Sequence, residues 1–314
     1  MFMRPMFRLV PDNLTFHYMR GRVLGLAISA VLSLASVGLF FYPGLSLGID
    51  FKGGIIMEVK TPAAADIGKI RAALAAQGLR TEGVQRFGDE ASVAIRLEAQ
   101  PTEAATQVVV TKVRTAVEAA QPGSRIVRTD AVGASVSAEL FADGMKALGF
   151  SLLMILAYIW FRFEWQFAVG AVVTLILDLT KAIGFLAITG LDFDLVMIGA
   201  LLTILGYSTN DKVVVYDRMR ENLRKYKTMP LRDLIDLSIN ETLGRTLGTS
   251  MTVFLASLPL ALFGGSTLSG FAWCMLFGIV VGTSSSIFIA APILLFLGEN
   301  RLRRDTQVAK EAPV

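Results

Sequence analysis

Twenty consecutive residues without a charged side chain, from Val23 to Tyr42, constrain this chain more than any other feature of its sequence. A helix needs about 20 apolar residues to cross the hydrocarbon core of a bilayer. Similar runs recur after residue 142, whereas residues 48–140 have the composition of an ordinary soluble protein. The pattern therefore predicts a polytopic α-helical membrane protein that carries one water-exposed domain.

The overall composition shows that apolar residues are concentrated rather than evenly spread. Of the 314 residues, 54% are hydrophobic and 18% are charged, and the mean hydropathy is +0.58. Soluble domains have about a quarter of charged residues. The net charge of +4 comes from Lys and Arg residues that gather beside the apolar runs, as topology signals do in membrane proteins. We therefore expect no nucleic-acid partner.

The chain offers few residues for catalysis or metal binding. Cys274 is its only cysteine and His17 its only histidine, so no intramolecular disulfide can form and a zinc site is not expected. We find no phosphate-binding loop, no nucleophile–histidine pairing and no carboxylate cluster of the metal-ligand type in the soluble part. The sequence predicts a protein that is not an enzyme and holds neither a metal nor a cofactor.

Six apolar segments are long enough to be membrane spans. They lie at residues 23–42, 143–161, 167–188, 194–216, 246–264 and 271–297, so that five of them fall within 143–297. The first is longer than the core of a secretory signal peptide and is expected to be an uncleaved anchor. Short flanks rich in Lys and Arg stay in the cytoplasm. This places the N-terminal residues 1–22, the basic loop 217–245 and the tail 298–314 in the cytoplasm, and residues 43–142 on the other side.

The domain at 43–142 shows strand and helix patterns in alternation. Strands are predicted near 55–59, 83–87, 91–97 and 125–132, with a hairpin turn at 88–90. Helices are predicted at 66–77, ended by Gly78, and at 102–120, where Thr102 can cap the first turn. The order β-α-β-β-α-β is that of a small ferredoxin-like α+β domain. Such a domain does not by itself indicate a function.

Residues 230–244 alternate apolar and charged side chains at helical spacing. This pattern is typical of a helix that lies along a membrane surface. A linker helix that docks on the protein's own bundle would show the same pattern. The sequence leaves both interpretations open.

Two acidic residues lie inside predicted spans, where each costs about 2.5–3.5 kcal/mol. Asp178 is near the middle of the span 167–188, and Lys181 follows it on the same helical face. One interpretation is an intrahelical ion pair whose members offset one another. The other is that Asp178 faces a hydrated crevice and exchanges protons.

Asp211 belongs to a polar group that interrupts the span 194–216. Tyr207 and Ser208 precede it by four and three residues and are expected to flank it on its helical face. A carboxyl group shielded from water can exchange protons near neutral pH, so Asp211 is a candidate proton carrier. The alternative is a structural role in which Asp211 joins two helices by hydrogen bonds.

Arg245 begins the span 246–264 and has two ordinary explanations. It can extend its guanidinium to the membrane interface, or it can pair with Glu241 four residues earlier. It is also the nearest candidate counter-charge to Asp211. In the last span, Gly278 and Gly282 form a G-x-x-x-G, for which close helix packing is the default interpretation.

Four motifs of the chain resemble those of one protein family. They are GIDFKGG at 48–54, the segment 206–222 that begins GYSTND, NETLGRT at 240–246 and GTSSSIFIAAP at 282–292. Representative positions of these motifs are Gly48, Asp50, Gly53, Gly54, Gly206, Asn210, Asp217, Arg218, Gly282 and Pro292. On these motifs the chain resembles the SecF type of the SecD/SecF family of the resistance–nodulation–division superfamily, whose members are proton-driven membrane proteins.

The resemblance implies a site, partners and a location. Asp211 and Arg245 would be the charged pair tied to proton passage, with Asp178 as a further candidate. The chain would be a multi-pass protein of the bacterial inner membrane whose 43–142 domain faces the periplasm. Its partners would be a SecD-like subunit, the SecYEG channel, the exported polypeptide and the lipid bilayer. The sequence departs from the family pattern at Lys212, Gly244 and Ser284.

The resemblance leads to one function hypothesis with two alternatives. The chain, paired with SecD, would couple inward proton flow to movement of the periplasmic domain and so assist translocation through the Sec channel. The first alternative is a proton-coupled small-molecule exporter of the same superfamily. The second is a passive scaffold of the translocon.

Overall fold

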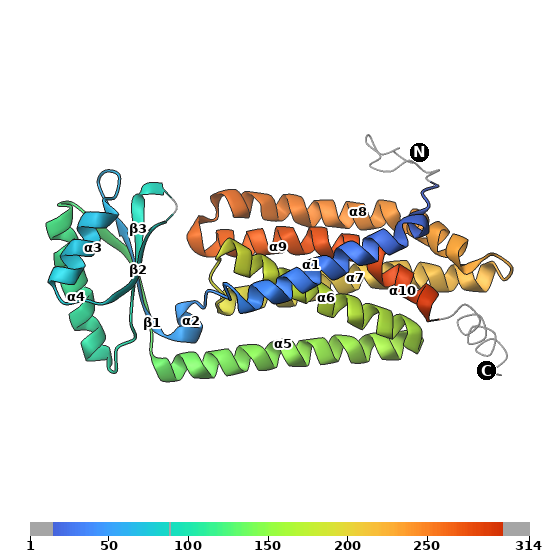
Figure 1. The fold of residues 1–314 in the computed structure, drawn as a ribbon, viewed down its shortest axis with the longest axis horizontal. Coiled ribbons are helices and arrows are strands. Elements are labelled where there is room, and N and C mark those ends of the chain that lie inside the picture. The colour runs from blue at the N-terminus through green and yellow to red at the C-terminus, as the bar shows by residue number, and fades with distance from the viewer. Residues whose placement is uncertain (1–14, 88, 298–314) are drawn as a thin grey trace, which may run out of the picture.

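A bundle of long helices forms one half of the molecule, and a four-stranded sheet with two helices forms the other (Figure 1). The computed structural model describes residues 15–87 and 89–297. The two halves lie end to end along the longest axis of the molecule, and we call the end of the bundle opposite the sheet the distal end (Figure 1). Predictions about residues 1–14, Gly88 and the tail 298–314 lie outside the described residues.

The bundle is built from long helices and short segments that continue them. Its elements are η1 (Tyr18–Gly21), α1 (Arg22–Phe41), α5 (Ala134–Arg162), α6 (Trp165–Thr189), α7 (Leu195–Lys225), α8 (Leu231–Phe263), α9 (Gly265–Ser285), η2 (Ser286–Ala290) and α10 (Ala291–Phe296). Within the described ranges, five helices are long and apolar enough to cross a membrane: η1 with α1, α5, α6, α8, and α9 with its continuation. The protein is therefore largely helical and membrane-embedded.

The remaining long helix, α7, has 31 residues but falls outside that set of five. Its first half is apolar, whereas polar and charged side chains dominate from Tyr207 onward. It nevertheless lies inside the bundle, where it packs against α5, α6, α8 and α9. The least apolar long helix thus packs against four apolar ones, which cover most of its surface.

A single helix replaces two segments that the sequence suggested were separate. α8 runs without interruption through the predicted surface segment 230–244 and the predicted span 246–264. Leu231, Leu234 and Ile239 are buried in the main core of the bundle, so this part docks on the protein's own helices. Of the two interpretations that the sequence left open, the helix docked on the protein's own bundle is the one that the structure shows. No proline separates the two segments, and Gly244 and Gly248 cost only about 1 kcal/mol each in a helix interior.

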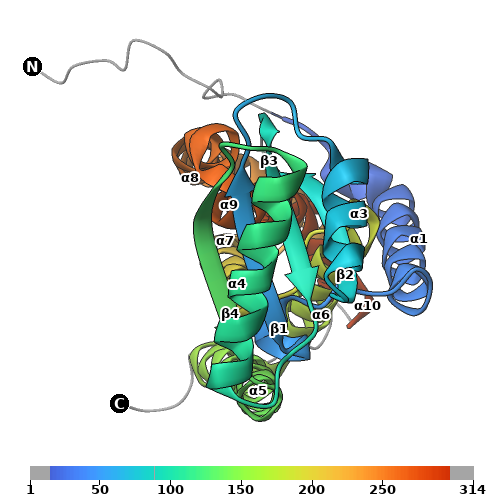
Figure 2. The same ribbon diagram turned by 90° about the vertical axis from the view of Figure 1, so that its left-hand side faces the viewer.

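The second half of the molecule is a small α/β domain. Its elements are β1 (Gly54–Lys60), α3 (Ile67–Ala76), β2 (Thr81–Phe87), β3 (Asp89–Leu97), α4 (Glu103–Ala120) and β4 (Arg125–Val132). The strands are ordered β2-β3-β1-β4, and each neighbouring pair is antiparallel. Helices α3 and α4 cover the face of the sheet that is turned away from the bundle (Figures 1 and 2).

Signals that act within a few residues of the sequence determine the strands and the helix starts of this domain. Ile55, Met57 and Val59 alternate along β1 and are buried against the two helices, as the two-residue period of a strand requires. The side chains of Asp66 and Thr102 accept hydrogen bonds from the backbone three residues later and cap α3 and α4. The bond to Asp66 also lowers the pKa of its carboxyl group. The predicted order of strands and helices is confirmed.

Candidate functional site

Four charged side chains are buried near one another in the interior of the bundle. Asp178 and Lys181 come from α6, and Asp211 and Lys212 come from α7; each is at most 5% exposed. We call this group the charge cluster. When all four are ionised, it contains two positive and two negative charges. Because an isolated charge is very costly in a low-dielectric interior, this balance is what allows the group to be buried.

Asp178 is the centre of the charge cluster. One of its oxygens, Oδ2, lies 3.0 Å from Lys212 Nζ and accepts hydrogen bonds from Ser208 Oγ at 2.8 Å and Ser285 Oγ at 2.7 Å. The other, Oδ1, lies 3.7 Å from Lys181 Nζ and has no hydrogen-bond partner among the described residues. The ion pair with Lys181 that the sequence suggested is present, and a second lysine from α7 is added to it.

Asp211 faces another side of α7 and joins a series of hydroxyl groups. Thr283 Oγ1 donates to Asp211 Oδ2 at 3.4 Å, and the hydroxyls of Thr283 and Ser250 lie 2.7 Å apart. Tyr207 donates to Ser250 Oγ at 2.5 Å. Hydroxyl groups can both donate and accept, so this series can pass a proton between α7, α8 and α9 by reorientation.

One predicted neighbour of Asp211 is placed elsewhere. We expected Tyr207 and Ser208 to flank Asp211, but Ser208 bonds to Asp178 and Lys212. Consecutive residues of a helix point about 100° apart, and Ser208 lies four residues before Lys212 and therefore on its face. Among the described residues, hydrogen bonds connect Tyr207 to Asp211 through Ser250 and Thr283.

Arg245 does not contact Asp211 in this structure. Within the described residues it has no ion-pair partner, and its side chain is exposed on the outside of the bundle. Glu241, its other predicted partner, pairs with Arg218 at 2.7 Å instead. The predicted Glu241–Arg245 pair is absent because Glu241 turns toward α7 while Arg245 turns away from it. The role of Arg245 in proton passage remains a prediction.

Arg245 nevertheless lies at the same level along the bundle axis as the charge cluster. The contacts Tyr207–Ser250, Arg218–Glu241 and Asn222–Ser238 show that α7 and α8 run in opposite directions with a fixed register. In this register Arg245 is level with Lys212, since each lies five residues from the Tyr207–Ser250 contact. Asn210 is also exposed on α7, so two strongly polar side chains face outward near this depth.

The motif at 48–54 attaches the α/β domain to the charged helix. Residues 49–52 form the single turn α2 (Ile49–Lys52), and Asp50 Oδ2 accepts a hydrogen bond from the backbone of Leu195 at 3.1 Å, at the start of α7. Gly53 and Gly54 have φ values of +75° and +136°, which favour glycine. A Cβ on Gly54 would lie 2.8 Å from the Leu97 carbonyl oxygen. The motif thus lets β1 begin directly beside the first turn of α7.

A second set of contacts strengthens this connection. Arg96 of β3 forms a two-pronged ion pair with Asp192, with Nη1 3.0 Å from Oδ1, and Ser46 Oγ donates to the same oxygen at 3.0 Å. The backbone of Phe193 bonds to Ser46 and Gly48. We call residues 46–50, 190–195 and Arg96 the joint. It lies where the α/β domain meets the bundle.

The other motif positions hold helices together. At the distal end, Asp217 pairs with Arg162 of α5 at 2.9 Å, and Arg218 pairs with Glu241 of α8. Gly282 lies against Ser208, whose Cβ would be 3.2 Å from an added Cβ. Pro292 follows a π-helical turn, η2, which accommodates the hydrogen bond that proline cannot make. Gly206 and Asn210 are exposed and are the exceptions.

Several residues of the site could not be identified from the sequence. Lys212 stood out only as a departure from a family pattern, although it is a charge in an apolar span and needed an opposite charge nearby. Ser285 and Thr283 gave no signal beyond their position in a small-residue run. Arg96 looked like any exposed strand residue. In the part of the chain that the structure describes, no group of three His, Cys, Asp or Glu residues could hold a metal ion.

Comparison with known families matches the motifs. The model of "Protein export membrane protein SecD/SecF, C-terminal" matches residues 112–300, and that of the "SecD/SecF GG Motif" matches residues 38–61. The protein translocase subunit SecF of Rhodobacter capsulatus is 42% identical over 307 residues, which are 94% of this chain and 92% of that protein. The SecF subunit of Rickettsia felis is 40% identical over 301 residues, which are 95% of this chain and 96% of that protein.

Solved structures agree with these matches. The crystal structure of SecDF, a translocon-associated membrane protein from Thermus thermophilus, aligns with a TM-score of 0.83 at 30% identity over 94% of this chain. SecDF in the super-membrane-facing form aligns with a TM-score of 0.65 at 28% identity over 99% of this chain. This chain spans 40% and 42% of the length of those two SecDF chains.

The fold and the motifs together define a membrane-embedded component of the protein-export pathway, of the SecD/SecF class. Its relatives match over nearly their whole length and carry the name of one of the two subunits. The chain belongs to the SecF family of protein translocase subunits.

Proposed function

We propose that this chain pairs with a SecD-like subunit in the bacterial inner membrane and uses the proton gradient to assist polypeptide translocation through the Sec channel, without a cofactor. The observation that carries the proposal is the charge cluster. Ionisable side chains inside a membrane protein are costly, and those that persist mark ion or proton pathways. A proton taken up by Asp211 changes the net charge of the cluster from zero to +1, which alters the forces between α6 and α7.

The proposed topology has six spans and a ferredoxin-like periplasmic domain. In support, α1 begins and α10 ends at the distal end of the bundle (Figure 1). An even number of crossings is needed for that, and α7 supplies the sixth. The distal end is then cytoplasmic, in line with its basic residues. The strand order β2-β3-β1-β4 with two helices on one face is the arrangement that a ferredoxin-like domain requires.

The mechanism that we propose uses α7 as a rigid connection. The charge cluster lies 16 to 17 residues from the start of α7, about 25 Å along its axis. At that start, Asp50 and the joint hold the α/β domain. A shift of α7 caused by proton uptake is therefore transmitted directly to the domain. One charge that crosses a potential of 100 mV supplies about 2.3 kcal/mol, enough to bias a conformational change of that size.

The SecD-like partner is supported by the outer surface of the bundle. Arg245 and Asn210 are exposed at membrane depth, where contact with lipid is unfavourable. A second subunit that covers this face would supply polar partners. The SecDF chains that align with this one are more than twice its length, which leaves room for such a subunit.

Membrane vesicles provide the test of the proposed function. Inverted vesicles that contain the Sec channel, the SecD-like subunit and this chain should translocate a secretory polypeptide faster when a proton gradient is imposed. Vesicles that lack only this chain should lose that stimulation. Equal stimulation without the chain would contradict the proposal, and a change in drug susceptibility without an export defect would favour the exporter alternative.

The joint gives a separate prediction. Arg96→Gln breaks the two-pronged pair with Asp192 and should reduce the gradient-dependent part of translocation at least threefold, because movement of α7 is then transmitted less completely. Restoring the pair with the exchange Arg96→Asp and Asp192→Arg should recover most of the loss. Arg86→Gln, which removes an exposed arginine from the neighbouring strand β2, is the matched control. An unchanged rate for Arg96→Gln in the vesicle assay would exclude the joint from the coupling.

A further inference from the structure

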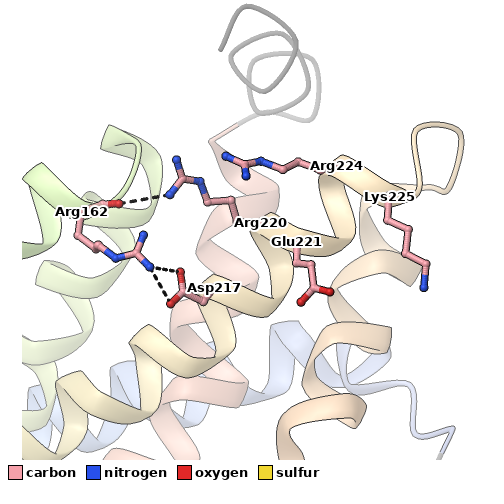
Figure 3. A pocket seen from close by; sticks show the side chains of 6 residues that line it. All are labelled: Arg162, Asp217, Arg220, Glu221, Arg224 and Lys225. Atoms are coloured by element: carbon pink, nitrogen blue, oxygen red, sulfur yellow. Dashed lines mark hydrogen bonds and ion pairs between the residues drawn. The ribbon is translucent and has the colours of Figure 1, made fainter. Parts of the chain in front are cut away.

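A basic pocket lies at the distal end, where the end of α5 meets the last turns of α7 (Figure 3). Its volume is about 430 Å³. The residues that line it are Arg162, Asp217, Arg220, Glu221, Arg224 and Lys225. Four of these six residues are basic and two are acidic, so the lining carries an excess of two positive charges. The charge cluster and its proton chemistry make no use of this pocket.

The acidic residues of the pocket are already engaged. Both oxygens of Asp217 accept from Arg162 Nη2, at 2.9 and 3.1 Å, and Glu221 pairs with Arg218 at 2.6 Å. Neither carboxylate contacts Arg220 or Arg224 closely enough to form an ion pair among the described residues. The positive charges of Arg220 and Arg224 are therefore not neutralised by the two carboxylates that line the pocket.

Arg220 has one ion pair, with Glu164 outside the pocket lining, and the groups of Arg224 are less engaged still. Arg220 Nε is buried, makes no hydrogen bond within the described chain and lies 3.6 Å from Glu164 Oε1. Arg220 Nη1 donates to the Arg162 carbonyl at 3.4 Å. Arg224 has no ion pair in the described ranges, and Figure 3 shows its guanidinium turned toward that of Arg220. Two like charges that face one another across a pocket form a favourable site for an anion.

The surroundings indicate which anion fits. Large aromatic side chains are exposed at the same end of α5 and at the start of α6: Trp160 is 61%, Phe161 94% and Trp165 40% exposed. Exposed Trp residues gather at the level of lipid headgroups. Nearer the middle of α5, Leu153 and Met154 are 60% and 70% exposed and offer an apolar surface for acyl chains. The pocket therefore lies at headgroup depth, and α5 carries an exposed apolar surface farther toward its middle.

We propose that this pocket binds the phosphodiester group of an anionic phospholipid, with Arg220 and Arg224 as its ligands. A guanidinium can form two parallel hydrogen bonds to phosphate oxygens. Arg162 is held by Asp217 and forms one wall of the pocket. The bound lipid would link the end of α5 to α7, the helix that carries Asp211.

Native mass spectrometry of the full chain in neutral detergent tests this proposal. We expect dioleoyl phosphatidylglycerol to bind at least tenfold more tightly than dioleoyl phosphatidylcholine. The double variant Arg220→Gln, Arg224→Gln should lose that preference. Each of the two substitutions should weaken the binding of phosphatidylglycerol by about fivefold or less. The matched control is Arg71→Gln with Arg232→Gln, which removes two exposed arginines that have no ion pair in the described residues; its affinity should stay within twofold.

Three results would overturn the proposal. The first is a preference for phosphatidylglycerol that survives in the double variant. The second is an equal loss in the control pair, which would mean that only total charge matters. The third is complete displacement of phosphatidylglycerol by 1 mM inorganic phosphate, added as a separate arm, which would make free phosphate the ligand. Arg224 is exposed, so the single variant Arg224→Gln should fold normally. On a logarithmic scale, its loss of affinity for phosphatidylglycerol should be about half of the loss in the double variant.

Discussion

Asp211→Asn is expected to abolish the proton-dependent stimulation of translocation while the chain still enters the membrane at its normal level. Asparagine has nearly the same size and can still accept a hydrogen bond from Thr283, so the contacts of α7 are kept. It cannot bind or release a proton near neutral pH. In the vesicle assay, the rate with an imposed gradient should fall at least tenfold toward the rate without one.

The matched control for this change is Asp233→Asn, which makes the same substitution at an exposed position at the start of α8. It should leave the stimulation intact. Undiminished stimulation in Asp211→Asn would remove the proton-carrier role. If a variant with both Asp211→Asn and Arg245→Gln still supported export, the passive scaffold would be the better explanation.

Asp178→Asn is expected to be the most destabilising conservative change in the bundle. It leaves Lys181 and Lys212 buried without the carboxylate that both contact, and breaking a buried pair from one side costs about 3–5 kcal/mol. The midpoint of thermal unfolding in detergent should fall by about 5 °C or more. Adding Lys212→Met should restore at least half of this loss, since one lysine then remains to balance Asp211.

The chain contains its own control for that experiment. Lys146 and Asp143 on α5 have the same spacing of three residues as Lys181 and Asp178, but their side chains are 65% and 62% exposed. Exposed pairs contribute about 0–1 kcal/mol. Asp143→Asn should therefore shift the unfolding midpoint by less than 2 °C. An Asp178→Asn variant that is as stable as Asp143→Asn would show that the charge cluster is not ionised in the folded protein.

Most of the α/β domain could be predicted because its signals are local. The alternation along β1, the caps at Asp66 and Thr102 and the stop at Gly78 act within a few residues. The five helices that are long and apolar enough to cross a membrane were also visible from hydropathy. The sequence did not reveal that residues 230–244 and the span 246–264 form one helix, because a change from charged to apolar composition does not end a helix when no proline or cap is present.

The site was predicted only in part because it depends on helix rotation. The sequence identified Asp178 and Asp211 as costly charges, yet it could not tell which neighbours each one faces. Their partners come from other helices: Lys212 and Ser285 for Asp178, and Thr283 for Asp211. Arg245 illustrates the same point, since only the register of α7 and α8 reveals that it shares the depth of the cluster but points outward.

The equal numbers of lysines and carboxylates inside the bundle have an electrical consequence. A group whose charges sum to zero feels almost no net pull from the voltage across the membrane, so the resting charge cluster is itself insensitive to it. Once a proton is added, the same group becomes a cation, and the field draws it toward the negative side. The charge cluster would then respond to the membrane potential only while Asp211 carries a proton.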